Sequence, residues 1–128
     1  MSLAHKPRAG VVVEVEGAGA VECTLVRVYA PRTFETLVSR LPIHTVLARG
    51  DGYVYFPVDI RRGVEKPRRE AEARWVAYWP RGDALCLFEK KVSMPTPISL
   101  LGEVKGDLSI LGSAKRGAKA VISVAVEV

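Results

Sequence analysis

Short apolar runs separated by turn residues recur along the chain, and their spacing favours strands. Residues 11–16 begin with three valines and continue with alternating Val and Glu, which is typical of a strand. A Gly-Ala-Gly turn at 17–19 leads into a second apolar run over 21–29. Together the two runs predict a β-hairpin.

Two segments carry helical signals instead. Pro31 and Thr33 mark the start of the first segment, and Pro42 ends it. The apolar residues between them recur at helical spacing: Phe34, Leu37, Val38 and Leu41. The second signal begins at Asp107, whose carboxylate can cap a short helix that contains residues 108–111. The sequence therefore predicts two short helices.

The rest of the chain returns to the strand pattern. Further strands are predicted over 43–48, 53–58, 98–104 and 121–126. Arg49-Gly50-Asp51-Gly52 is a strong turn signal between the first two. The polar stretch 61–72 and the proline-containing stretch 90–97 are expected to be loops. Many short strands with two brief helices indicate a mainly β fold, a closed barrel with helices at its ends.

Residues 75–88 form the most distinctive stretch. Two apolar runs flank the turn sequence Pro80-Arg-Gly-Asp83, and both tryptophans, Trp75 and Trp79, lie in the first run. Proline, glycine and aspartate each suit a turn. The stretch predicts a hairpin of two buried strands.

Length and composition are those of one soluble domain over residues 1–128. The chain has 128 residues, 48% of them hydrophobic and 26% charged, which suffices for a real core. Residues 1–8 are expected to be disordered or partly a leader. No apolar run approaches the ~18 residues that cross a bilayer, and no signal segment opens the chain. We therefore expect a cytoplasmic protein without a membrane partner.

The chain contains no asparagine and no glutamine. This gap resembles the bias against heat-labile amides in proteins from hot environments, and it removes amide side chains from any site. Cys23 and Cys86 lie far apart without a CxxC spacing, so we expect two buried thiols and no zinc site. No metal or cofactor is expected.

The net charge of +5 raises the question of an anionic partner. Basic residues gather at Arg61, Arg62, Lys66, Arg68 and Arg69, and again at Lys115, Arg116 and Lys119. Three glutamates, Glu65, Glu70 and Glu72, interrupt the first group, and no aromatic residue is interleaved with it. The pattern favours a solvated loop over a nucleic-acid site.

A longer motif identifies a family resemblance. Residues 78–88, Tyr-Trp-Pro-Arg-Gly-Asp-Ala-Leu-Cys-Leu-Phe, are followed by Met94-Pro95 and by Leu-Gly-Glu-Val at 101–104. This pattern resembles a family of small prokaryotic proteins with a cyclophilin-like fold, generally without an assigned activity. The resemblance covers nearly the whole chain. It implies a closed eight-stranded antiparallel β-barrel with two short capping helices.

The resemblance does not extend to the chemistry of prolyl isomerases. Where true cyclophilins carry the arginine that stabilises the twisted prolyl amide, this chain has Thr45. Their substrate-binding glutamine corresponds to Ala84, and their pocket phenylalanine to Cys86. Because a guanidinium aimed at the reacting amide supplies much of the stabilisation, we expect no efficient isomerase activity.

The candidate ligand pocket follows from the residues that remain on this barrel face: Thr45, Tyr55, Trp79, Cys86, Phe88 and Met94. The alternative is that Tyr55, Trp79, Phe88 and Met94 are simply barrel core. We expect a binding domain for a small molecule or peptide. The alternatives are a divergent isomerase or other enzyme that uses Arg49 or His44, and a structural protein that forms a homo-oligomer.

Overall fold

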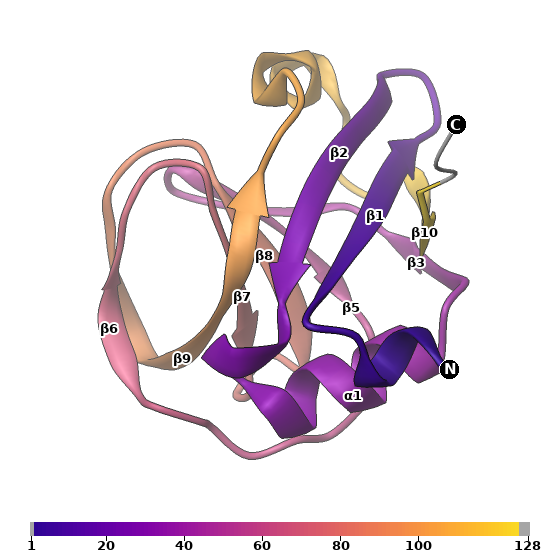
Figure 1. Ribbon diagram of the computed structural model, residues 1–128. Helices are drawn as coiled ribbons and strands as arrows, with labels where there is room; N and C mark the ends of the chain where they lie inside the picture. Colours follow the sequence, from indigo (N-terminus) through magenta and orange to yellow (C-terminus); the bar gives the residue numbers. More distant parts are fainter. Residues whose placement is uncertain (1, 126–128) are drawn as a thin grey trace.

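The computed structural model describes residues 2–125 as a mainly antiparallel β structure with a few short helices (Figure 1). The strands are β1 (Arg8–Val15), β2 (Gly19–Val26), β3 (Ile43–Val46), β4 (Ala48–Gly50), β5 (Tyr53–Pro57), β6 (Arg68–Ala71), β7 (Trp75–Trp79), β8 (Ala84–Phe88), β9 (Val92–Val104) and β10 (Lys119–Val124). The helices are α1 (Pro31–Ser39) and the 3-10 helices η1 (Leu3–His5), η2 (Arg27–Tyr29) and η3 (Leu108–Ser113).

The sheet has ten strands, and its hydrogen bonds do not close it into a barrel. Its order is β3-β10-β1-β2-β9-β7-β8-β5-β4, with β6 paired to β9 beside this path. The two end strands, β3 and β4, are consecutive in the chain and are separated only by Leu47. The two ends of the sheet are therefore joined by the chain at Leu47 and not by strand-to-strand hydrogen bonds. The expected closed barrel of eight strands is not confirmed.

Pro57 supplies a physical reason for the open seam between β3 and β5. The Thr45 hydroxyl donates a 2.6 Å hydrogen bond to the Pro57 carbonyl, so that carbonyl faces β3. In an antiparallel strand the N–H and C=O of one residue point to the same edge. Proline has no N–H to offer there, and a side-chain bond stands where a ladder bond would otherwise form.

The first hairpin and the first helix are confirmed. β1 and β2 pair from Arg8↔Val26 to Val15↔Gly19, and α1 begins at Pro31 and ends before Pro42. The residue before the helix, Ala30, offers no side-chain cap. Both local signals were strong, although the end of the second expected run, residues 27–29, forms η2 instead of strand.

The second helix is confirmed as a 3-10 helix. The Asp107 carboxylate accepts a 3.0 Å hydrogen bond from the Ser109 N–H, as its capping position predicts. The closing strand β10 covers most of the expected range 121–126, of which Val126 lies outside the described residues.

The stretch 90–97 is not the loop that its prolines suggested. β9 runs without interruption from Val92 to Val104 and pairs with β6, which lies in the stretch 61–72 that was also expected to be a loop. Pro95 and Pro97 fall between Ser93 and Ile98, where the register of this ladder shifts. Prolines are tolerated at such irregularities because no regular ladder bond is lost.

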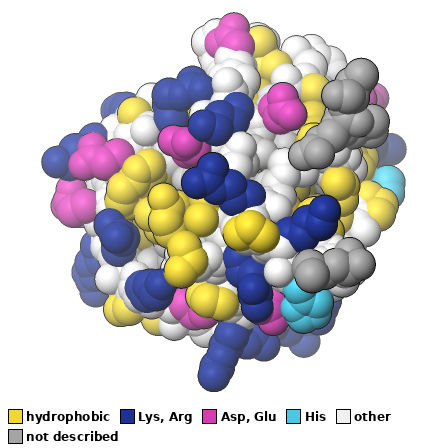
Figure 2. All heavy atoms as spheres, in the orientation of Figure 1, with side chains coloured by type: hydrophobic (Ala, Val, Ile, Leu, Met, Phe, Trp, Pro, Cys, Tyr) yellow, Lys and Arg dark blue, Asp and Glu magenta, His cyan; other side chains and the backbone are white. Residues whose placement is uncertain are grey.

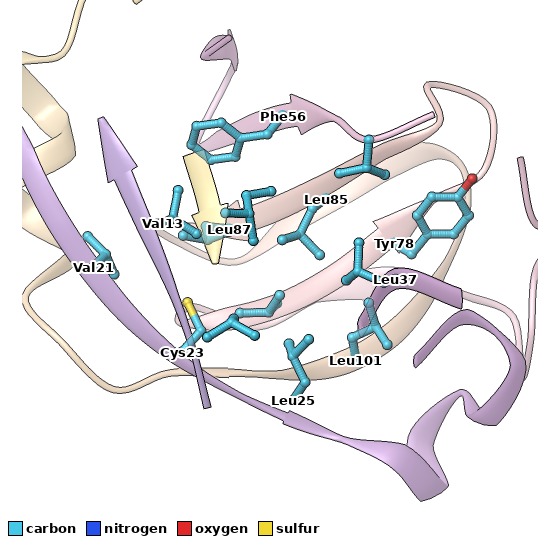
Figure 3. Close-up of a cluster of buried hydrophobic side chains, with 14 of the residues drawn as sticks. Val13, Val21, Cys23, Leu25, Leu37, Phe56, Tyr78, Leu85, Leu87 and Leu101 are labelled. Carbon is cyan, nitrogen blue, oxygen red and sulfur yellow. The ribbon is translucent and has the colours of Figure 1, made fainter. Parts of the chain in front are cut away.

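The main core lies between the strands and α1 (Figure 3). It contains Phe34 from α1, Phe56 from β5 and Leu85 from β8, all fully buried. The side chains labelled in Figure 3 point toward one another from β1, β2, β5, β7, β8, β9 and α1. Cys23 lies in this core, and Cys86 in a second, smaller cluster; both thiols are free and buried, as expected.

Within the described residues 2–125, no helix has the length and apolar character needed to cross a membrane.

Candidate functional site

A large hollow lies along the open seam of the sheet. It is an open groove of about 1240 Å³, and we call it the seam groove. It is lined by residues 14–20 from the first hairpin, residues 43–46 of β3, residues 57–59 at the end of β5 and just after it, and residues 119–121 of β10. Of the six predicted pocket residues, only Thr45 lies here.

β3 presents a free edge to this groove. It pairs with β10 on one side and is the end of the hydrogen-bond order on the other. The side chain of Val46 on this edge is 43% exposed. A free strand edge with an exposed apolar side chain is a ready template for another extended segment.

The charges around the seam groove are mixed. Glu14 and Glu16 come from the first hairpin, and Lys119 comes from β10. Asp59 is also present, but its carboxylate pairs with Arg61 at 3.0 Å. His44 is exposed at the same wall. The groove is therefore a polar-rimmed surface with an apolar strip at Val46.

Asp83 holds the wall of the groove that follows β5. Its carboxylate accepts hydrogen bonds from the Tyr78 hydroxyl at 2.6 Å and from the N–H groups of Ile60 and Arg61. The Val58 N–H also donates to the Asp83 carbonyl at 2.9 Å. One turn residue thus fixes three points of the segment after β5 and bonds to Tyr78 of β7.

These contacts also move the pKa values of the pair. Burial raises the pKa of the Tyr78 hydroxyl, and the bond to the Asp83 carboxylate raises it further. Burial acts to raise the pKa of Asp83 as well, but the hydrogen bonds from Tyr78, Arg61 and Ile60 outweigh it and lower that pKa. The carboxylate is held in its charged form as a structural acceptor.

Five of the six predicted pocket residues gather on the opposite side of β5 and β8 from the main core. Phe88 and Cys86 are fully buried there, and Met94 is 2% exposed. Tyr55 and Trp79 are half-buried and meet edge-on, with ring centroids 5.6 Å apart at 88°. We call this set the outer cluster. It also contains Ala71, Ala77, Ile98 and the partly buried residues Tyr53, Trp75 and Val92.

The outer cluster is packed rather than hollow. Tyr53 fills the space beside Phe88 and Tyr55, with ring centroids 5.6 and 5.8 Å away. The Trp79 indole N–H donates to the Thr96 hydroxyl at 2.7 Å, which ties the ring to β9. The buried members therefore act as a second core, and the half-buried residues around them, Tyr53, Tyr55, Trp75, Trp79 and Val92, reach the surface.

Two glycines give the aromatic rings their places. A methyl group at Gly50 would lie 2.1 Å from the Tyr53 ring, and one at Gly82 would lie 2.5 Å from the Trp79 ring. Each ring therefore packs directly against the backbone of a glycine. This contact assigns a packing role to the glycine in the motif over 78–88. Sequence reasoning assigned Gly50 and Gly82 to turns alone and left out Tyr53 and Thr96.

The two residues considered for an alternative enzyme are separated. Arg49 lies in β4, not in the turn, and its guanidinium donates to the carbonyls of Leu111 and Ala114. It therefore ties η3 to the sheet. His44 lies in the seam groove, whereas its neighbour Thr45 is already bonded to Pro57. Among residues 2–125, no three His, Cys, Asp or Glu side chains converge on a metal position.

The fold agrees with the comparisons with known proteins. A family described as Cyclophilin-like matches residues 10–123. This chain belongs to the Cyclophilin-like family. The search of curated proteins found no match.

Two solved structures share the fold of this Cyclophilin-like protein. One is the solution structure of a hypothetical protein from Archaeoglobus fulgidus, with a TM-score of 0.78 and 23% identity, covering 93% of this chain and 96% of that one. The other is McbB in complex with tryptophan, with a TM-score of 0.74 and 13% identity. That match covers 92% of this chain but 45% of McbB. At these identities the likeness concerns the fold.

Proposed function

We propose that this Cyclophilin-like protein binds an extended peptide segment in the seam groove and has no efficient prolyl isomerase activity. The observation that carries the proposal is the free edge of β3 beside a groove of about 1240 Å³. An extended peptide recognises such an edge through its main chain, while pockets along the strand select side chains.

The register of β3 identifies the backbone groups that would bind. The Leu47 N–H donates to the Ala118 carbonyl on the β10 side. Since backbone groups alternate along an antiparallel strand, the N–H and C=O groups of Val46 and His44 point to the free edge. An added strand would satisfy these groups, and its side chains would lie against Val46 and the polar rim.

The second half of the proposal rests on what stands at the isomerase positions. Thr45 has no guanidinium, and its hydroxyl is bonded to Pro57. Ala84 and Cys86 are fully buried, so neither side chain reaches a substrate from the surface. Arg49, the nearest arginine in sequence, donates to carbonyls of η3. Nothing at these positions supplies the charge that would stabilise a twisted amide.

The binding test uses a phage-displayed library of random linear peptides, from which the strongest binder is synthesised and titrated into ¹⁵N-labelled protein. We expect the amide resonances of His44 and Val46 to shift more than those of Tyr55 and Trp79. A binder that moves only the outer-cluster resonances would place the site there and contradict the proposal.

A pair of variants isolates the edge. Val46→Pro removes the N–H at the free edge and leaves the β10 ladder intact, whereas Val46→Ala trims the side chain but keeps the N–H. We expect Val46→Pro to abolish binding and Val46→Ala to weaken it about fivefold, with circular dichroism confirming the fold of each. Equal affinities in the two variants would rule out strand addition.

Two further measurements separate the alternatives. Light scattering at micromolar concentration reports whether β3 pairs with a second copy, and a dimer lost in Val46→Pro would replace the peptide by that copy. A protease-coupled assay with prolyl peptides is expected to show no acceleration. Activity that disappears in Arg49→Ala would overturn the second half of the proposal.

A further inference from the structure

A second surface, distant in sequence from the seam groove, combines aromatic and basic side chains. It lies over the outer sides of β2, β7 and β9 and consists of Arg8, Tyr29, Lys66, Arg68, Trp75 and Lys105. We call it the basic aromatic face. Figure 2 shows hydrophobic side chains gathered on this face of the molecule, with Lys and Arg and also Asp and Glu side chains around them.

Two shallow hollows adjoin on this face. One, of about 140 Å³, is bordered by Arg8, Trp75 and Lys105, and the other, of about 120 Å³, by Lys66 and Arg68. They share Tyr29 and Leu100 as a common wall. An aromatic ring thus stands between two pairs of cations.

Of the two rings on this face, Tyr29 is exposed and Trp75 has a guanidinium over its ring. Tyr29 is 41% exposed although it is a large hydrophobic residue. The Arg68 guanidinium lies 5.3 Å from the centroid of the Trp75 ring, an arrangement that presents a flat cationic surface to solvent. Lys66 is held in place because its ammonium group donates a 2.6 Å hydrogen bond to the Val28 carbonyl.

The charge balance of the two hollows is strongly positive. Their lining residues include four cations, Arg8, Lys66, Arg68 and Lys105, against one carboxylate, Glu103. Glu103 is paired with Lys105 at 2.7 Å. Lys66 and Arg68, beside the second hollow, face no carboxylate among its lining residues. This charge balance favours an anionic partner.

We propose that the basic aromatic face binds single-stranded nucleic acid. Bases stack on exposed aromatic rings, and phosphates follow a line of cations, which is the combination found here. Cations on both sides of Tyr29 fit the phosphates on both sides of one stacked base, so a polynucleotide suits the face better than a mononucleotide does. An acidic peptide would use the cations but would leave the rings without a matching flat surface.

The sequence pattern favoured a solvated loop over a nucleic-acid site because glutamates interrupt the first basic group and no aromatic residue is interleaved with it. The interleaving occurs in space instead. Tyr29 comes from the helix that follows β2, and Trp75 comes from β7. The fold brings both residues beside Lys66 and Arg68.

The test measures fluorescence anisotropy of labelled oligo(dT) titrated with the full chain at increasing salt. If four phosphates are contacted, the logarithm of the affinity should fall with the logarithm of the salt concentration at a slope of about −3. Tyr29→Ala should weaken binding about tenfold at fixed salt, because one stacked base loses its platform. Since Tyr29 is exposed, this variant should fold normally.

A matched pair of double variants separates the face from net charge. Lys66→Gln with Arg68→Gln should lower the salt slope by about 1.4. Lys115→Gln with Arg116→Gln removes the same charge from an exposed segment outside the basic aromatic face and should leave the slope unchanged. Equal weakening in both pairs would show binding by net charge alone and overturn the proposal.

Competition decides between the related ligands. Unlabelled oligo(dT) should displace the probe at micromolar concentration, and thymidine monophosphate should not. Displacement by the monophosphate at the same concentration would assign the face to a free nucleotide. If poly-glutamate displaces the probe and Tyr29→Ala has no effect, the partner is an acidic chain and the proposal fails. None of these outcomes bears on peptide binding at β3.

Discussion

The two faces of the strands β5, β7 and β8 are both apolar but are built differently. The inner face contributes Val54, Phe56, Val76, Tyr78, Leu85 and Leu87, all fully buried in the main core. The outer face contributes Tyr53, Tyr55, Ala77, Trp79, Cys86 and Phe88, of which the tyrosines and Trp79 are only half-buried. β9 and β6 cover this second face with few large side chains, chiefly Met94 and Ile98.

The difference explains the unbroken apolar runs in residues 75–88. A strand covered on both faces reads as a continuous hydrophobic segment, as the strands of buried sheets do. The inner face is filled by interlocking aliphatic side chains and buried rings. The outer face uses flat rings over glycines and ends at solvent, so it should tolerate change better than the inner face does.

The largest loss of stability is expected for a substitution on the inner face. Phe56→Ala should lower the free energy of unfolding by about 4 kcal/mol, because it removes a fully buried ring and leaves a cavity. Tyr55→Ala, one residue away on the outer face, should cost about 2 kcal/mol, since that ring is half-buried. Urea unfolding measures both. Equal losses would show that the outer cluster is packed as tightly as the main core.

The second prediction tests the hydrogen bonds that the Tyr78 hydroxyl makes at the edge of the inner face. Tyr78→Phe removes the hydroxyl that donates to Asp83 and accepts from the Arg62 N–H. The loss of these buried bonds should cost about 2 kcal/mol. Tyr53→Phe makes the same chemical change on the outer face and should cost less than about 0.5 kcal/mol. A similar loss in both variants would refute a special role for the Tyr78–Asp83 bond.

The third prediction concerns the contact between rings and glycines on the outer face. Gly50→Ala places a methyl group against the Tyr53 ring, which must swing away at a cost of about 1 kcal/mol. Because Tyr53 meets Trp79 edge-on, tryptophan fluorescence should change as well. Gly63→Ala, where a methyl group meets open space, should be neutral or slightly stabilising. A neutral Gly50→Ala with unchanged fluorescence would contradict this packing.

Elements with local signals were predictable from the sequence, and those that depend on distant partners were not. The first hairpin and α1 have their turn, proline and spacing within a few residues, so each formed as expected. The pairing of β6 with β9 could not be predicted because prolines and charges mark both segments as loops. Their burial of Ala71 and Ile98 against the outer cluster stabilises the ladder.

The candidate site could likewise be predicted only in part from the sequence. The pattern of aromatic residues placed five pocket residues in one cluster, because they alternate on strands that pair directly: Tyr55 with Cys86, and Tyr53 with Phe88. Burial of the Cys86 thiol was expected, but the sequence left open whether Phe88 and Met94 line a pocket or belong to the core, since the strand that covers them came from an expected loop. Thr45 faces the open seam, which depends on Pro57 and has no local signature.

The smallest expected effect concerns the segment that connects the two regions. Glu65 caps α1 from a distance: its carboxylate accepts hydrogen bonds from the Thr33 N–H and hydroxyl, both at 2.7 Å, and from the Arg32 N–H. Its own N–H donates to the Ser99 hydroxyl on β9 at 2.8 Å. Glu65 therefore joins the helix of the main core to the strand that covers the outer cluster.

This cap predicts a defined pH dependence. Partial burial acts to raise the pKa of Glu65, but the hydrogen bonds from Thr33 and Arg32 outweigh it and lower the pKa below its ordinary value of 4.5. Because the folded pKa is the lower one, the stabilisation is complete above pH 4.5 and is lost as the pH falls through the folded value. Glu65→Gln should therefore cost about 1 kcal/mol near pH 7 and almost nothing near pH 2.

The control is Glu16→Gln, which removes the same charge from the exposed turn between β1 and β2. Thermal unfolding at several pH values compares the two variants with the original chain. A loss of pH dependence in Glu65→Gln alone assigns the effect to the helix cap. If both variants flatten the profile equally, net charge governs acid stability, and Glu65 does not couple the two regions in this way.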